Sequence, residues 1–198
     1  MAGVDPGRHP AARHPRSHPG LDRSCRLFGL VADRRRRRHI QVASRVPQAI
    51  EPPLLGAGGQ VVKRMGDGLM AVFPDPVTAI GAMLEAREAL KSVEVEDYAP
   101  VMRVGIHTGR PQKLGADWLG VDVNTAARVM ESATKGGVLV SGPTVEKISA
   151  EHLDGLGVSV KQLRKPVFWH RPSGVPANMT KYRLETRRQL PAPGPAEQ

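Results

Sequence analysis

Residues 60–73, QVVKRMGDGLMAVF, contain the strongest local signal for secondary structure in the chain. Two apolar runs that suit β-strands, residues 60–65 and 69–73, flank the turn sequence Gly66-Asp67-Gly68. An Asp-Gly pair between two such runs is typical of a tight β-hairpin, because glycine adopts the backbone angles that these turns require. The stretch therefore predicts a hairpin in the middle of the chain and antiparallel pairing of its strands.

Helix and strand patterns alternate after this hairpin. Pro76 suits the first turn of a helix that extends to about Val93, and Gly136-Gly137 ends a second helix. The other expected elements are strands at residues 101–108, 138–141, 158–160 and 182–184, a loop at 109–120, and helices at 121–133 and 143–148. This mixture predicts an α+β fold in which helices pack on one face of a mostly antiparallel sheet.

The basic charge of the chain is concentrated in its first quarter. The 198 residues carry a formal net charge of +10, and residues 1–50 alone hold eleven arginines and three aspartates, a net +8. A run of five arginines, residues 34–38, invites a contact with nucleic acid or acidic lipid. Because no aromatic residues interleave with the run and no zinc-finger or helix-turn-helix pattern follows it, we favour a solvated charged stretch and no specific nucleic-acid partner.

Composition also limits the compartment and the domain organisation. Cys25 is the single cysteine, which excludes an internal disulfide and a four-cysteine zinc site. No apolar run approaches the ~18 residues of a membrane-spanning helix, so we expect no transmembrane segment and a cytoplasmic location. We divide the chain into a disordered basic segment at residues 1–26, a folded domain at 27–190 and a loose tail at 191–198.

Three segments taken together carry the functional signal. They are residues 62–68, VKRMGDG, residues 103–109, RVGIHTG, and residues 117–128, DWLGVDVNTAAR. In this order and spacing they resemble the catalytic domain of the class III nucleotidyl cyclases, the adenylate and guanylate cyclases. The resemblance covers about residues 60–148 and implies a ferredoxin-like domain that forms a cyclic nucleotide at the interface of a dimer.

Asp67, at the tip of the expected hairpin, is the candidate metal ligand. A carboxylate exposed between two glycines is a hard oxygen donor that suits Mg²⁺, although alone it could serve only the turn. The resemblance implies that Asp67 is one of two aspartates that hold two Mg²⁺ or Mn²⁺ ions. The other aspartate belongs in the first strand, where this chain has Leu30 in the corresponding position of LFGLVADR, residues 27–34. Asp33 is the alternative candidate there.

Lys63 and Asp117 are the candidate base-reading pair. A lysine donates to a ring nitrogen and a carboxylate accepts from an exocyclic amine, so the pair complements adenine, whereas guanine has the opposite polarity on that edge. Each unpaired buried polar group costs ~1–3 kcal/mol, which is enough for selectivity. The resemblance implies that this combination accompanies ATP, whereas Lys63 taken alone would be read as a solvated strand lysine.

Asn124 and Arg128 lie four residues apart on an expected helix, so they share a face. The resemblance places the asparagine at the ribose and the arginine at the triphosphate, for which its planar fork is suited. His107 invites assignment as a catalytic base, but we favour a structural role for it. The lysine that contacts phosphate in related domains stays unassigned, because Ser173 stands in its position.

The resemblance therefore implies an adenylate cyclase that converts ATP into 3′,5′-cyclic AMP and pyrophosphate as a homodimer. The altered first strand indicates an alternative, a degenerate domain that binds nucleotide or pairs with another cyclase as a heterodimer without turnover. The same alteration suggests that residues 1 to about 38 are a mis-read or decayed segment.

Overall fold

The computed structural model describes residues 26–33, 40–65, 68–93, 100–115, 117–164 and 179–187. The expected disordered segment at residues 1–26, apart from Arg26, and the expected tail at 191–198 lie outside the described residues, so the division into segments stays a prediction. The arginine run at residues 34–38 and the predicted metal ligand Asp67 also lie outside them.

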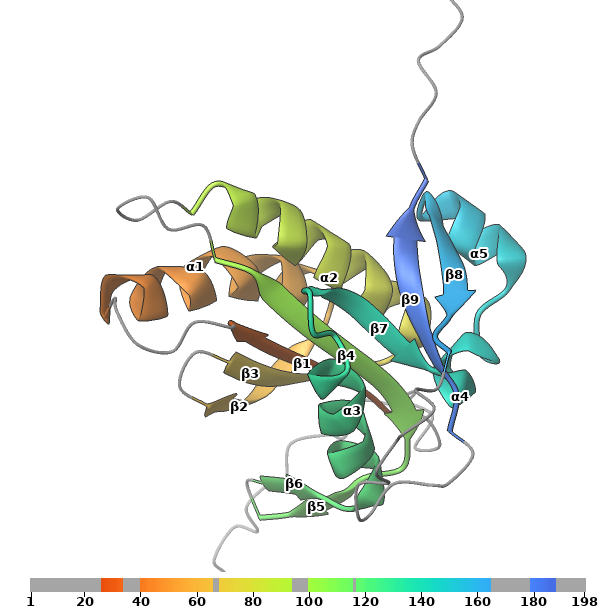
Figure 1. Ribbon diagram of the computed structural model, residues 1–198. Coiled ribbons are helices and arrows are strands. Elements are labelled where there is room, and N and C mark those ends of the chain that lie inside the picture. Colours follow the sequence, from red (N-terminus) through yellow and green to blue (C-terminus); the bar gives the residue numbers. More distant parts are fainter. Residues whose placement is uncertain are drawn as a thin grey trace, which may run out of the picture.

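A seven-stranded sheet forms the centre of the fold (Figure 1). In spatial order its strands are β2 (Gln60–Met65), β3 (Gly68–Phe73), β1 (Arg26–Asp33), β4 (Met102–Gly109), β7 (Gly137–Ser141), β9 (Lys181–Thr186) and β8 (Val158–Gln162). Neighbouring strands are antiparallel except β4 and β7, which are parallel. The expected α+β fold with a mostly antiparallel sheet is therefore confirmed, and so is the hairpin that joins β2 to β3.

Helices cover both faces of the sheet, whereas the sequence predicted helices on one face. The helices are α1 (Ile40–Gly56), α2 (Pro76–Lys91), α3 (Val121–Glu131), α4 (Gly142–Val145) and α5 (Ala150–Gly155). α1 and α2 pack together behind the sheet in Figure 1, and α3 crosses in front of β4. Gly105 of β4 explains this placement, because a β-carbon there would lie 2.5 Å from the carbonyl oxygen of Ala126 in α3. The missing side chain lets α3 approach the strand backbone.

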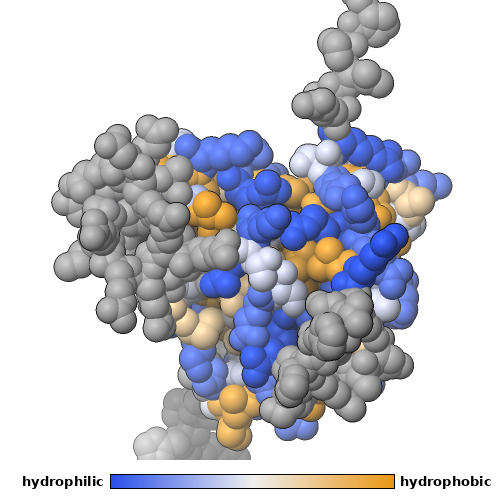
Figure 2. Space-filling view, viewed as in Figure 1, coloured by the Kyte–Doolittle hydropathy of each residue, from blue (hydrophilic) through white to orange (hydrophobic). Residues whose placement is uncertain are grey.

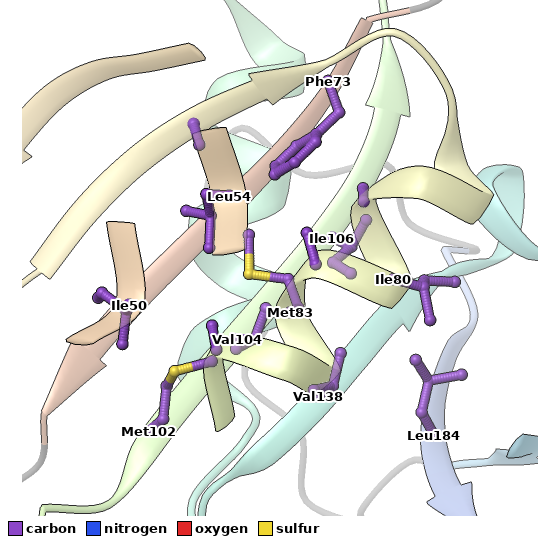
Figure 3. Close-up of a cluster of buried hydrophobic side chains, with 14 of the residues drawn as sticks. Ile50, Leu54, Phe73, Ile80, Met83, Met102, Val104, Ile106, Val138 and Leu184 are labelled. Atoms are coloured by element: carbon purple, nitrogen blue, oxygen red, sulfur yellow. The ribbon is translucent and has the colours of Figure 1, made fainter. Parts of the chain in front are cut away.

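The main hydrophobic core lies between the sheet and the α1–α2 layer (Figure 3). Ile50 and Leu54 of α1 and Met83 of α2 are almost fully buried there. They meet alternate residues of the strands, such as Val104 and Ile106 of β4, because successive side chains of a strand point to opposite faces. The core therefore fixes which β4 residues remain on the α3 face.

The N-terminal part of the domain consists of β1, which lies where the resemblance placed the first strand, and α1, which was not anticipated. β1 is a central strand that pairs with both β3 and β4. α1 contains Pro47, Pro52 and Pro53, each of which lacks the backbone N–H of a regular helix hydrogen bond. The burial of one apolar stripe on α1 offsets this loss, since Val46, Ile50 and Leu54 recur every four residues and are all buried.

The expected loop at residues 109–120 contains a small hairpin of its own. β5 (Gln112–Leu114) and β6 (Asp117–Leu119) pair antiparallel beside the main sheet. In the part of the chain that the structure describes, no helix has both the length and the apolar character to cross a membrane.

Candidate functional site

The candidate site lies over a second apolar cluster, on the α3 face of the sheet, which we call the α3 floor. Its buried members are Met70, Val72, Trp118 and Ala126, and its partly buried members are Val62, Val123, Ala127 and Met130. These side chains come from β2, β3, β6 and α3. The α3 floor therefore brings together segments that are far apart in the sequence.

Each predicted nucleotide-binding residue is a chain neighbour of a floor residue. Lys63 follows Val62, and Asp117 precedes Trp118. Along α3, Asn124 follows Val123 and Arg128 follows Ala127.

The structure brings Lys63 and Asp117 together, although 54 residues separate them in the chain. The Lys63 Nζ atom donates a hydrogen bond of 2.7 Å to Asp117 Oδ2. Asp117 Oδ1 accepts a second bond, of 2.9 Å, from the backbone N–H of Trp118. The bond from Lys63, followed by that from Trp118, holds the pKa of Asp117 below its ordinary value. Both side chains remain almost half exposed, at 46% and 42%, so a ligand can reach them.

A β-bulge in β2 directs Lys63 to this place. Val61 pairs with Ala71 and Lys63 with Met70, so the register shifts by one residue between them. A bulge of this kind inserts one extra residue and re-aims the side chains beside it. Lys63 therefore lies opposite the floor residue Met70, next to Val62. No sequence pattern at this position would have predicted the bulge.

α3 carries Asn124 and Arg128 four residues apart on its outer side. Asn124 is exposed and Arg128 is half-buried. Arg128 Nη1 donates a 2.7 Å hydrogen bond to Glu131 Oε2, three residues further along the helix. Because this ion pair is exposed to solvent, it is weak enough for Arg128 to exchange Glu131 for another anion.

Lys181 is a residue of this region that the sequence analysis did not identify. Its Nζ atom donates to Ser132 Oγ at 2.6 Å and to the Arg128 carbonyl oxygen at 3.4 Å. A cation at a helix C-terminus opposes the negative end of the helix dipole, so Lys181 stabilises the last turn of α3. Burial lowers the pKa of Lys181, and the nearby Arg128 charge acts in the same direction while Glu131 opposes it.

Of the two predicted metal ligands, Asp67 and Asp33, only Asp33 lies within the described residues. Asp67 lies outside the described residues, and no group of three or more His, Cys, Asp or Glu side chains suited to a metal occurs within them. Position 30 of β1 pairs with Met70 on one side and Gly105 on the other. Asp33 pairs with Met102 at the end of the strand. Positions 30 and 33 are three residues apart, so a regular strand places them on opposite faces of the sheet.

Both ring nitrogens of His107 are engaged, and the side chain is buried. Its Nδ1 atom lies 2.7 Å from Ser141 Oγ and its Nε2 atom lies 3.1 Å from Asp122 Oδ1. Burial lowers the pKa of His107, and the Asp122 carboxylate opposes that shift. These contacts favour the structural role over that of a catalytic base.

Sequence comparisons find relatives among the adenylate cyclases, and no protein-family model matches the chain. A Rhizobium meliloti protein named as an adenylate cyclase is 32% identical over 136 residues, which is 65% of this chain and 23% of the relative. A pH-sensitive adenylate cyclase of Mycobacterium tuberculosis is 34% identical over 95 residues, 48% of this chain and 23% of the relative. The chain thus spans about a quarter of the length of these relatives.

Solved structures with the same fold are cyclase domains. An adenylate cyclase of Trypanosoma brucei, in its monomeric state, has a TM-score of 0.67 at 18% identity, over 81% of this chain and 89% of that chain. The catalytic core of a rhodopsin-guanylyl cyclase with converted specificity, in complex with ATPαS, has a TM-score of 0.66 at 18% identity, over 83% and 97% of the two chains. At these identities the likeness establishes the fold.

Proposed function

We propose that this chain, which has the fold of the class III nucleotidyl cyclase catalytic domains, binds ATP and supports the formation of cyclic AMP in a dimer. Its sequence similarity to adenylate cyclases supports this proposal. The observation that carries the proposal is the contact between Lys63 and Asp117. It supplies a donor and an acceptor side by side over the α3 floor.

The ion pair has hydrogen-bonding capacity left for a base. An ammonium group has three N–H donors and a carboxylate has about four acceptor sites, so the bond between Lys63 and Asp117 and the bond from Trp118 leave about two donors and two acceptor sites unused. Lys63 can donate to an adenine ring nitrogen while Asp117 accepts from the exocyclic amine, without breaking their contact. Guanine offers a ring N–H to Lys63 and a carbonyl to Asp117, so both groups would be mismatched.

The outer side of α3 suits the rest of the nucleotide. Asn124 would bind the ribose, and Arg128 would leave Glu131 for the triphosphate, where its fork forms charge-assisted hydrogen bonds. In the proposed reaction the ribose 3′-oxygen forms a bond to the α-phosphorus and loses its proton. The bond from the α-phosphorus to the bridging oxygen breaks, and pyrophosphate leaves.

A second subunit would complete the site, as it does in the domains that this chain resembles. Exposed apolar side chains on the β5–β6 hairpin and the start of α3 support such a contact. Leu114, Leu119 and Val121 are 69%, 46% and 57% exposed, and Figure 2 shows apolar surface at the lower end of the molecule, where β5 and β6 lie in Figure 1. We call these three residues the β5–β6 apolar patch.

The first strand, β1, does not fit a site of two metal-binding aspartates. Leu30 has no atom that binds Mg²⁺ or Mn²⁺, and Asp33 belongs to the opposite face of a regular strand. A homodimer would repeat this defect in both of its sites. Leu30 therefore favours a heterodimer, in which another cyclase chain supplies both aspartates and this chain supplies the residues that bind ATP.

Cyclic AMP formation by mixed subunits tests the proposal. The partner is an intact class III adenylate cyclase domain whose own base-reading lysine is replaced by alanine, so that it needs this chain to bind ATP. We expect cyclic AMP from the mixture with Mn²⁺ and ATP, and much less from either chain alone.

Two variants of this chain serve as matched controls. Lys63→Ala removes the donor to adenine, whereas Lys91→Ala removes an exposed lysine of α2 that pairs with Glu88. We expect the first to abolish the activity of the mixture and the second to leave it intact. A mixture that forms no cyclic AMP, or that is indifferent to Lys63→Ala, would overturn the proposal.

A further inference from the structure

A series of largely buried hydrogen bonds links the start of α3 to the sheet. Asp122 Oδ1 lies 3.1 Å from His107 Nε2, and His107 Nδ1 lies 2.7 Å from Ser141 Oγ. Ser141 Oγ lies 2.9 Å from Thr144 Oγ1, which accepts a 3.2 Å bond from Thr108 Oγ1. These hydrogen bonds thus connect α3, β4, β7 and α4.

The chemistry of the groups determines which atom donates and which accepts in each hydrogen bond of this series. A carboxylate only accepts, so His107 carries its proton on Nε2 and donates it to Asp122. In the neutral ring, Nδ1 then accepts from the Ser141 hydroxyl, and Ser141 Oγ accepts from Thr144. Burial lowers the pKa of His107, which agrees with a neutral ring. Each buried donor in the series therefore has an acceptor.

Asp, His and Ser in this order also occur in hydrolases that use serine as a nucleophile. Ser141 and Thr144, however, have no exposed surface. Because no substrate can approach Ser141, nucleophilic catalysis is excluded. The series of bonds must act through the position of α3.

α3 depends on this series of hydrogen bonds because its first turn has no side-chain cap. The N-cap residue is Gly120, and no side-chain hydrogen bond satisfies the free N–H groups there. Asp122 directs its carboxylate to the sheet instead, where Oδ2 accepts a 2.7 Å bond from the Arg110 N–H. Gly109 leaves room for the Asp122 carboxylate, since a β-carbon at position 109 would lie 2.6 Å from Asp122 Oδ1.

We propose that His107 is a positioning residue that, through Asp122, sets the first turn of α3 and so the place of Asn124. Asn124 lies two residues after Asp122, and its N–H makes the first helical bond, of 3.3 Å, to the Gly120 carbonyl oxygen. The inference rests on the proposed function for the role of Asn124 at the ribose, but the link between His107 and the helix stands on geometry alone.

Two substitutions of His107 separate its two contacts. His107→Gln places an amide N–H about where Nε2 lies, so it keeps a donor to Asp122 and loses the contact with Ser141. His107→Asn is one carbon shorter, so it keeps a partner for Ser141 and loses the donor to Asp122. Ser141→Ala is a third variant, which removes a buried partner of His107 without touching the contact to Asp122.

Hydrogen exchange of the amides of residues 124 and 125, the first in α3 that make helical hydrogen bonds, and the kinetics of cyclic AMP formation by the mixed subunits are measured for each variant. We expect His107→Asn to speed exchange in this turn and to lower kcat by about tenfold or more, because a small displacement of an aligned group has a large effect on rate. His107→Gln is expected to retain slow exchange and most of the kcat. Ser141→Ala is expected to lower the melting temperature without speeding exchange at residues 124 and 125 selectively.

Equal effects of His107→Asn and His107→Gln on the turn, or no effect of either, would overturn the inference. If the wild-type mixture forms no cyclic AMP, the proposed function fails. The exchange rates still decide the positioning role in that case, because they need no turnover. The two failures are therefore distinguishable.

Discussion

His107 couples the stability of the fold to pH. Burial lowers its pKa below the ordinary value of about 6.5, while Asp122 opposes the shift. In the unfolded chain the imidazole binds a proton near pH 6.5, whereas in the folded chain it does so only at lower pH. Between these two values the unfolded state binds more protons, so the free energy of unfolding decreases as the pH falls.

Thermal unfolding between about pH 7 and about pH 5.5 measures this coupling. We expect the melting temperature to fall with pH in the wild type, and to fall less steeply in His107→Gln, which has no titrating ring. Parallel curves for the two proteins would assign the pH dependence to other groups and contradict the prediction.

The contact between Lys63 and Asp117 could not be predicted from local sequence patterns. Nothing local connects positions 63 and 117, and only the resemblance to cyclases predicted that the two side chains act together. The β2 bulge and the paired ring nitrogens of His107 depend on tertiary neighbours. Sequence patterns carry no signal for such contacts, because they arise when separate elements meet.

At the scale of elements, the approach of α3 to β4 depends on Gly105. In Gly105→Ala the new β-carbon would meet backbone atoms of α3, 2.5 Å from Ala126 O and 2.7 Å from Met130 Cα. A backbone cannot rotate away as a side chain can, so the helix must shift. We expect a loss of ~1–3 kcal/mol in the free energy of unfolding and weaker ATP binding, measured by denaturant unfolding and titration with ATP.

Gly81→Ala in α2 is the matched control for this prediction. Its β-carbon would lie 3.5 Å from Leu156 Cδ2, which is an ordinary contact. Alanine is also the better helix former by ~1 kcal/mol. We therefore expect Gly81→Ala to be neutral or stabilising, and a Gly105→Ala variant that behaves likewise would show that α3 does not need the close approach.

The elements with strong periodicity were predicted well, and those with conflicting signals were not. α2 and α3 follow their apolar spacing, and the β2–β3 hairpin follows its Asp-Gly turn. α1 was missed because three prolines oppose the buried stripe that forms it. β5 and β6 were read as a loop, because three-residue strands are too short to show alternation.

At the scale of the whole molecule, the proposed function requires a second chain, and the β5–β6 apolar patch is the surface that we expect it to cover. Leu114→Asp places a charge in the patch and should weaken the association of this chain with the partner cyclase chain, as measured by sedimentation of the mixture. Leu55→Asp is the control, because Leu55 is similarly exposed, at 54%, but lies on α1. Equal behaviour of the two variants would contradict the assignment of the interface.

The relative affinity of the protein for ATP and GTP is the most direct test of the proposed role of the Lys63–Asp117 pair. Displacement of a fluorescent adenine nucleotide by ATP or by GTP gives the two dissociation constants, for the wild type and for Lys63→Ala. Because GTP would leave both groups of the pair without a matched partner, we predict that ATP binds at least about tenfold more tightly than GTP. Lys63→Ala should remove most of this preference. Equal affinities in the wild type, or a preference that survives Lys63→Ala, would contradict the claim that this pair reads adenine.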